Sequence, residues 1–205
     1  MKKQRLWFVI ALLILQAGCS LGTPTRPSEF YVLSVDPGQP VSARGDSTKS
    51  LSLGLGPLSM PDVYERPQIV TRPNPNQVNL AEFDRWAGDL ERNLEQVLAQ
   101  NLMSRLNTDS VFVYPWSSRD ELDFQVTVRF FRFDGELGYV ARIEGVWRLR
   151  DWKRGCELAT RSFQINERPD GKGYPALVRA MSTGVAQLSQ EIAEQVVVTE
   201  PGCAE

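Results

Sequence analysis

Two long stretches of alternating apolar and polar residues stand out in the second half of the chain. Residues 122–130 (LDFQVTVRF) and 139–149 (YVARIEGVWRL) place every second side chain on an apolar face. Because successive strand residues point to opposite sides, each stretch predicts a strand with one buried and one solvated face. The turn signal Asp134–Gly135 lies between them, so we expect an antiparallel pair. After a second turn at Arg154–Gly155, residues 157–165 predict a third strand.

Two other segments repeat their apolar residues at helical spacing. In residues 88–106 the repeating positions are Leu90, Leu94, Val97, Leu98, Leu102 and Leu106. In residues 175–196 they are Leu177, Met181, Gly184, Leu188 and Ile192, and Pro175 stands at a position that suits the first helical turn. Both patterns predict amphipathic helices.

The first half of the chain predicts shorter strands, at residues 30–35, 51–58, 68–71 and 78–83, and a further one follows at 111–114. The resulting order of strands, helix, strands, helix is typical of an α+β fold. We expect a mainly antiparallel sheet with the two amphipathic helices packed on one face. Gly54 and Gly56 are interpreted as close-packing positions, because the helix start and Lys-Ser/Thr pair of a phosphate loop do not follow them.

The N-terminus has the organisation of an export signal. Lys2, Lys3 and Arg5 precede an apolar run of about ten residues, which is shorter than the roughly 20 residues of a membrane-spanning helix. Ala17-Gly18 then precedes Cys19 as in a lipobox, although Gln16 stands where a lipobox usually has Leu. We therefore predict a lipoprotein signal peptide at residues 1–18 and lipid attachment at Cys19.

This N-terminus also predicts where the domain resides. Residues 19–29 form the lipidated N-terminus and a proline-containing tether, and residues 30–205 form one periplasmic α+β domain. Ser20, rather than Asp, follows Cys19, which favours lipid anchoring in the outer membrane of a Gram-negative bacterium. Loss of residues 1–18 lowers the net charge from −2 to about −5, which disfavours nucleic acid as a partner.

The remaining cysteines, Cys156 and Cys203, form an even pair in an oxidising compartment. Either they form a disulfide that closes a loop of about 47 residues, or they are separate thiols. Their spacing does not predict a metal site, and we expect no cofactor.

The sequence offers little catalytic chemistry. The chain has no histidine, which excludes Ser-His-Asp and Cys-His mechanisms. The acidic pairs Asp120/Glu121 and Asp134/Glu136 flank predicted turns, where we expect solvated carboxylates rather than an acid and base. We therefore predict no catalytic residues and a protein that is not an enzyme.

Four aromatic side chains allow two interpretations. These are Trp116, Phe131, Phe133 and Trp152, of which Phe131 falls on the solvated face of its strand. They form an apolar surface for a partner or a lipid, or the helices or another chain cover them.

Several strings resemble the PqiC family of auxiliary lipoproteins of ABC-type and MCE-type transport systems. The strings are Phe30-Tyr31-Val32-Leu33, residues 61–72 (PDVYERPQIVTR), residues 83–87 (FDRWA), Val113-Tyr114-Pro115-Trp116 and residues 188–193 (LSQEIA). Residues 66–72 are the most specific part. Trp86-Ala87-Gly88-Asp89-Leu90 departs from the Trp-Ala-Glu-Pro-Leu of relatives, at the entrance of the first helix.

The resemblance implies a non-enzymatic outer-membrane lipoprotein that docks the outer-membrane end of a PqiB-like MCE tube. Through that tube it would act with a PqiA-like inner-membrane protein in lipid transport between the two membranes, as a ring-like homo-oligomer. Arg66, Arg72 and Trp86 are candidates for the partner interface, with a structural role as the alternative. Two other function classes stay open, namely a lipoprotein of outer-membrane β-barrel assembly and a carboxylate-dependent envelope hydrolase.

Overall fold

The computed structural model describes residues 26–41, 51–116, 122–199 and 203. Cys19, Asp120 and Glu121 lie outside these residues. In chain order the elements are β1 (Glu29–Tyr31), β2 (Leu53–Ser59), the 3-10 helix η2 (Asp62–Tyr64), β3 (Gln68–Asn74), β4 (Gln77–Trp86), α2 (Leu90–Leu106), β5 (Val111–Val113), β6 (Phe124–Glu136), β7 (Val140–Asp151), β8 (Glu157–Glu167) and α3 (Tyr174–Val198).

A five-stranded sheet in the order β5-β2-β6-β7-β8 forms the largest layer. The predicted antiparallel meander is confirmed, since β7 pairs with both β6 and β8 in antiparallel ladders. Most residues of the predicted apolar face are buried, among them Phe124, Val126 and Val128. Tyr139, predicted on that face, is instead 65% exposed because it lies in the turn before β7, and Asp134 and Asp151 are buried as well. The alternation could not reveal the position of β2, which lies between β5 and β6 and runs parallel to both.

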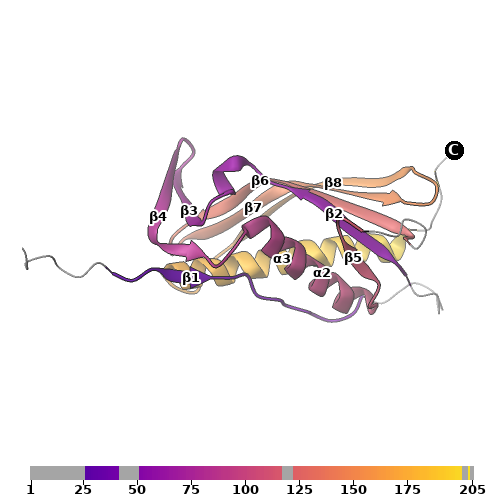
Figure 1. Cartoon of the computed structure of the whole chain (residues 1–205), viewed down its shortest axis with the longest axis horizontal. Coiled ribbons are helices and arrows are strands. Elements are labelled where there is room, and N and C mark those ends of the chain that lie inside the picture. The colour runs from indigo at the N-terminus through magenta and orange to yellow at the C-terminus, as the bar shows by residue number, and fades with distance from the viewer. Residues whose placement is uncertain (1–25, 42–50, 117–121, 200–202, 204–205) are drawn as a thin grey trace, which may run out of the picture.

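Helices α2 and α3 pack on one face of this sheet, which confirms the predicted α+β fold with its two helices (Figure 1). Gly184 lets α3 approach the sheet closely, because a Cβ atom there would lie 2.6 Å from Cδ1 of Ile143. At the entrance of α2, the Asp89 carboxylate accepts a hydrogen bond of 2.8 Å from the Arg92 backbone N–H. Asp89 therefore caps this helix despite the unusual string around it.

The strands β1, β4 and β3 form a separate three-stranded sheet in that order, where the sequence suggested one sheet. Strand β1 pairs in parallel with the end of β4, and β3 pairs with β4 in an antiparallel ladder. Figure 1 shows this small sheet at one end of the long axis, whereas the β7–β8 hairpin reaches the other end.

The strand predicted at residues 30–35 is shorter than expected, because the ladder ends at Tyr31. The backbone beyond it runs along the helices, and helix side chains take the place of a strand partner. The N–H groups of Leu33, Ser34 and Asp36 donate to Asn93 Oδ1 (2.8 Å), Ser182 Oγ (3.1 Å) and Asn101 Oδ1 (3.0 Å). These acceptors satisfy backbone groups that would otherwise be left without partners.

The prediction of a turn at Asp134–Gly135 is wrong. Both residues belong to β6, and the chain turns at residues 137–139, where Gly138 has a φ of 72°. An irregularity in the β6–β7 ladder between Phe130 and Arg132 carries the strand onward with Phe131 as an extra residue. Within the described residues, no helix is long and apolar enough to cross a membrane.

Candidate functional site

Asp134 is buried beneath the small sheet, where the sequence predicted a solvated carboxylate. Its side chain has 0% exposure and accepts three hydrogen bonds, from Tyr64 Oη (2.9 Å), Arg72 Nε (2.7 Å) and Arg132 Nε (2.7 Å). The prediction of a solvated side chain failed because η2 and β3 cover this end of β6. We name Asp134, Tyr64, Arg72 and Arg132 the Asp134 cluster.

The electrostatics of this cluster fit a structural link rather than a catalytic site. Burial and the negative charge of Asp134 both raise the pKa of Tyr64, which keeps its phenol protonated. The hydrogen bond to Asp134 raises the pKa of Arg72. A carboxylate that accepts three donors is poorly placed to take a further proton from a substrate. The cluster therefore joins β3 and η2 to β6 by charged hydrogen bonds.

The structure does not bring together the three residues predicted as a partner interface, because Arg72 lies apart from Arg66 and Trp86. Arg72 belongs to the Asp134 cluster, whereas Trp86 lies at the other end of the β3–β4 pairing. Trp86 is only 5% exposed, and its ring centroid lies 6.5 Å from that of Phe133. Arg66 lies close to Trp86, because the Trp86 N–H donates to the carbonyl of Pro67 (2.7 Å). Trp86 is thus a core residue, and Arg72 is occupied by a buried partner.

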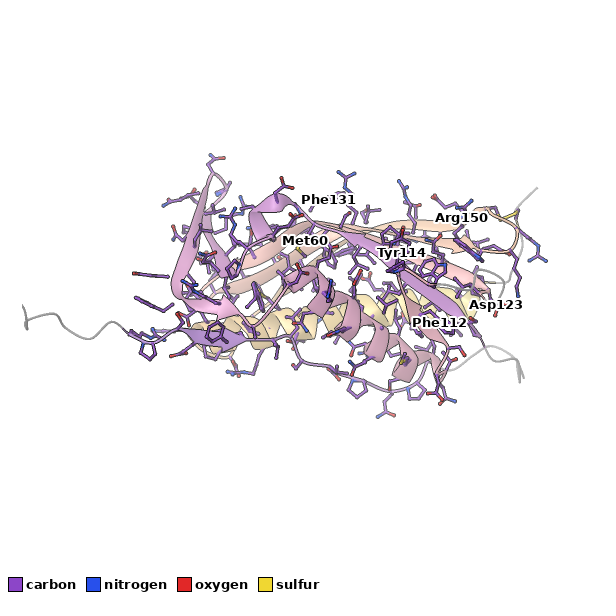
Figure 2. All side chains as sticks on the ribbon, viewed as in Figure 1. Met60, Phe112, Tyr114, Asp123, Phe131 and Arg150 are labelled. Atoms are coloured by element: carbon purple, nitrogen blue, oxygen red, sulfur yellow. A yellow bond between two sulfur atoms is a disulfide. The ribbon has the colours of Figure 1, made fainter. Side chains whose placement is uncertain are left out.

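A cluster of aromatic rings lies on the face of the large sheet away from the helices. We name Tyr114, Trp116 and Trp152 the aromatic platform. The Tyr114 and Trp116 rings meet edge to face at 5.3 Å, and Trp116 meets Trp152 in the same way at 5.6 Å. Tyr114 is 49% exposed, and the two tryptophans are half-buried. Figure 2 shows Tyr114 beside β2, with Arg150 farther toward the same end of the molecule.

Two glycines of β2 make room for these rings, as predicted from their close-packing role. A Cβ atom on Gly54 would lie 3.2 Å from Trp116 Cη2 and 2.7 Å from Leu122 Cδ1. Gly56 has a φ of +118°, and a Cβ atom there would lie 2.7 Å from Cβ of Tyr114. The rings therefore rest directly on the backbone of β2.

Three arginines continue this surface across β6 and β7. We name Arg129, Arg148 and Arg150 the arginine row. Arg148 is 61% exposed and lies 3.7 Å from Glu157, whereas Arg150 donates to the carbonyl of Gly155 (2.8 Å). The Arg129 guanidinium lies 5.7 Å from the centroid of the exposed Phe131 ring. A shallow depression of about 450 Å³ lies over Arg148 and Arg150. Between them, the three guanidinium groups have one carboxylate partner within the described residues.

The four aromatic residues singled out in the sequence have different environments. Phe133 is buried in the core and meets Phe130 edge to face at 5.9 Å. Phe131 is 52% exposed on the open face, as the alternation predicted. Trp116 and Trp152 join the platform although 36 positions separate them in the chain. The sequence pattern missed Tyr114 and the arginine row as parts of one surface, and the only signal for it was the glycine spacing in β2.

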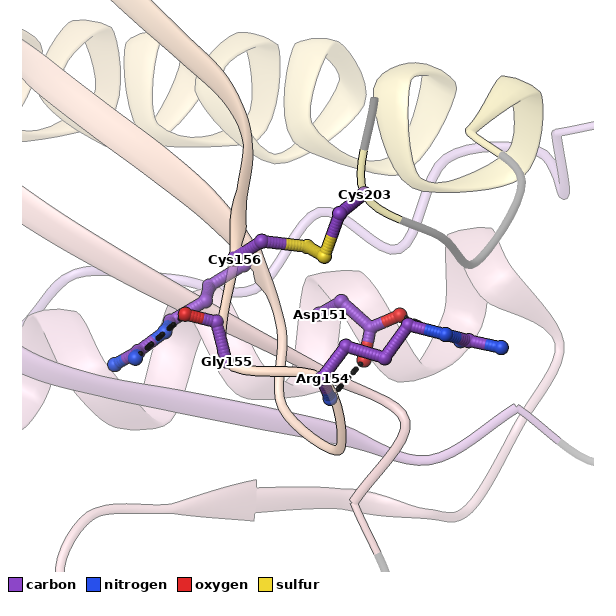
Figure 3. Close-up of a disulfide and its surroundings, with 6 residues drawn as sticks. Asp151, Arg154, Gly155, Cys156 and Cys203 are labelled. Atoms are coloured by element: carbon purple, nitrogen blue, oxygen red, sulfur yellow. Dashed lines mark hydrogen bonds and ion pairs between the residues drawn. A yellow bond between two sulfur atoms is a disulfide. The ribbon is translucent and has the colours of Figure 1, made fainter. Parts of the chain in front are cut away.

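A disulfide joins Cys156 and Cys203 (Figure 3). Cys156 lies in the segment between β7 and β8, which reaches the end of the long axis opposite β1 (Figure 1). The two Cα atoms are 5.8 Å apart, and the bond ties residue 203 to the segment between β7 and β8. Two ion pairs hold that segment, Lys153–Asp123 at 2.7 Å and Arg154–Asp151 at 2.9 Å.

Asp151, the acidic partner in the second of these pairs, has a pKa lowered from its ordinary value. Burial alone would raise the pKa of Asp151, but the hydrogen bonds from the backbone and side chain of Arg154 outweigh burial and lower it.

Over the described ranges, no three Cys, Asp or Glu side chains are grouped as metal ligands.

Comparison with known proteins covers nearly the whole chain. Residues 31–193 match the family described as ABC-type transport auxiliary lipoprotein component. The intermembrane transport lipoprotein PqiC of Escherichia coli K12 is 25% identical over 194 residues, which cover 93% of this chain and 96% of that relative. PqiC of Shigella flexneri matches to the same extent.

Two crystal structures share the fold. Protein XCC0632 from Xanthomonas campestris has a TM-score of 0.65 at 18% identity, over 83% of this chain and 95% of that one. An uncharacterised protein has a TM-score of 0.68 at 22% identity, over 83% of this chain and 99% of that one.

Proposed function

This chain belongs to the family of ABC-type transport auxiliary lipoprotein components, and from that premise we propose its place in the cell envelope. It is a non-enzymatic lipoprotein on the periplasmic face of the outer membrane, and it docks the outer-membrane end of a PqiB-like MCE tube. The match to PqiC over nearly the full length of both chains carries this proposal, because the name of that relative specifies intermembrane transport.

Anchoring is assigned to Cys19. Acyl chains contribute about 0.8 kcal/mol per buried CH₂, and two or more of them hold a protein stably on a membrane. Ser20 at the second mature position directs the protein to the outer membrane in this proposal. Residues between Cys19 and β1 then act as the tether.

The packing of the described domain favours an adaptor over a lipid carrier. The space between the helices and the large sheet is filled by fully buried side chains, such as Leu94 and Leu98 of α2 and Met181 and Leu188 of α3. Interiors packed in this way have little room for an acyl chain. The lipid route is therefore assigned to the MCE tube and the PqiA-like protein, and this domain supplies an attachment point.

A ring-like homo-oligomer completes the proposal. Exposed apolar side chains on the small sheet, namely Phe30, Val78 and Leu80, support it, because a neighbouring copy could cover them. Head-to-tail contacts between identical copies close into rings when the rotation between copies allows it.

The proposal is tested by affinity purification of the full-length protein extracted from membranes. Mass spectrometry then identifies the co-purified proteins and the modification on Cys19. We expect an acylated Cys19 and a PqiB-like MCE protein. Recovery of barrel assembly proteins in place of the MCE protein would contradict docking and favour the β-barrel assembly class. An unmodified Cys19 would contradict the anchor.

A further inference from the structure

We propose that the aromatic platform and the arginine row form the docking surface for the periplasmic tube protein, through an acidic part of that partner's surface with apolar side chains. This assignment rests on the proposed function and names the surface that carries it out. Three features of the described residues support it, namely the position of the surface relative to the anchor, the ordering of the rings, and the charge.

Position is the first argument. Described residues begin at Arg26 at the β1 end of the long axis, whereas the platform and the disulfide lie toward the opposite end (Figures 1 and 2). Seven residue steps separate Cys19 from Arg26, and they reach at most about 25 Å. Strand β6, with 13 residues, extends roughly 43 Å. The reach of the tether is therefore shorter than β6. When the β1 end of the domain faces the membrane, the platform at the opposite end faces the periplasm, where the tube arrives.

The rings are already ordered for binding. Tyr114 and Trp116 rest on the glycines of β2, and Trp152 completes the edge-to-face row at 5.6 Å. Binding to rings that are held in place costs less conformational entropy than binding to mobile side chains. Tyr, Trp and Arg are also the residues that most often dominate the energy of protein interfaces. The platform thus has the composition and the rigidity of an interface centre.

Charge selects the partner. Lys153 and Arg154 are neutralised by Asp123 and Asp151. The arginine row keeps an excess of positive charge, since Glu157 is its one carboxylate within the described ranges and lies 3.7 Å from Arg148. The chain as a whole has a net charge of −2, so this local excess stands out. A partner surface with carboxylates complements it and would speed association.

The test is photo-crosslinking of the full-length lipoprotein in intact membranes. p-Benzoylphenylalanine replaces Tyr114 at the platform. In a matched control it replaces Tyr139, which is 65% exposed in the β6–β7 turn at the other end of the sheet. Crosslinked products are identified by mass spectrometry. We expect Tyr114 to crosslink to the PqiB-like MCE protein at least ten times more than Tyr139 does.

Charge reversal sharpens this test. Arg148→Glu with Arg150→Glu should reduce the Tyr114 crosslink at least tenfold, while the melting temperature and Cys19 acylation stay unchanged. Arg161→Glu with Arg168→Glu makes the same charge change outside the arginine row, at residues that are exposed, and should leave the crosslink intact.

Each other product overturns the assignment. A Tyr114 crosslink to phospholipid would mean that the surface faces the membrane, and one to a second copy would make it a subunit contact. If the MCE protein co-purifies but crosslinks only at Tyr139, the platform is refuted while the proposed function stands. If the MCE protein does not co-purify with the parent protein, which has no photo-crosslinking residue, the proposed function fails as well.

Discussion

The two ends of the large sheet use the same residue types in opposite ways. At the end near the small sheet, Arg72 and Arg132 are held by the buried carboxylate of Asp134. At the far end, Arg148 and Arg150 lie on the open face. Arg148 lies 3.7 Å from the Glu157 carboxylate, and Arg150 donates to the carbonyl of Gly155. Buried charge that is fully paired fixes the arrangement of the two sheets, whereas exposed charge with spare donors remains available to another molecule.

The largest expected effect follows from breaking the buried end. Asp134→Asn keeps the shape of the side chain but removes the negative charge that faces two guanidinium groups. Loss of one partner from a buried ion pair costs about 3–5 kcal/mol. We expect the free energy of unfolding in urea to fall by that amount. As a control, Asp170→Asn removes the partner of Arg179 at an exposed site, and it should have a far smaller effect.

Loss of the disulfide should be next in size. Cys203→Ala opens a loop that spans 47 positions, and the chain-entropy estimate for such a loop is about 4 kcal/mol. We expect a lower unfolding free energy, with the far end of the sheet affected first. Urea unfolding gives the total loss, and hydrogen exchange of β7 and β8 locates it. Equal loss of protection at the Asp134 cluster would contradict a local role for the bond.

Gly56→Ala should perturb the platform by a smaller amount. The new Cβ atom would lie 2.7 Å from Tyr114, at a backbone φ of +118° that other residues rarely adopt. Overpacking of this kind costs about 1–3 kcal/mol. Thermal unfolding and tryptophan fluorescence would both report the change. Gly88→Ala is the matched control, because a Cβ atom there meets no described heavy atom within 4 Å, and it should unfold like the parent protein.

The smallest effect is a pH dependence at the far end. The folded protein lowers the pKa of Asp151 from its ordinary value of 3.8, so its ionised form stabilises the fold. This contribution is fully present above the unfolded pKa and disappears as the pH falls through the lower folded value. The difference in unfolding free energy between the parent protein and Asp151→Asn should therefore shrink as the pH drops below about 4. A constant difference down to pH 2 would contradict this.

The sequence predicted the elements whose burial follows a regular period. Alternation located β6 and β7, and helical spacing located α2 and α3. It failed where tertiary partners override the local pattern. The apolar run after Tyr31 bonds to helix side chains rather than to a strand, and Asp134 lies in a strand beneath the small sheet rather than in a turn.

The candidate site was harder to predict than the fold. The rings of Trp116 and Trp152 come from segments that are distant in the sequence. The backbone of β2, against which the platform packs, reaches this position only because β2 pairs in parallel with β6. The recognisable string around Arg66, Arg72 and Trp86 pointed instead to residues that hold the small sheet, of which Trp86 is core. A sequence motif that resembles a family can therefore contain residues that maintain the fold as readily as residues that bind a partner.

The most direct test is the dissociation constant between the full-length lipoprotein and the PqiB-like MCE protein. It is compared between the parent protein and the variant with Arg148→Glu and Arg150→Glu, with urea unfolding of both as the check on folding. Binding through the exposed end predicts at least tenfold weaker association of the variant, with an unchanged unfolding midpoint. Equal affinity of two equally stable proteins would contradict the assignment of the open face as the docking surface.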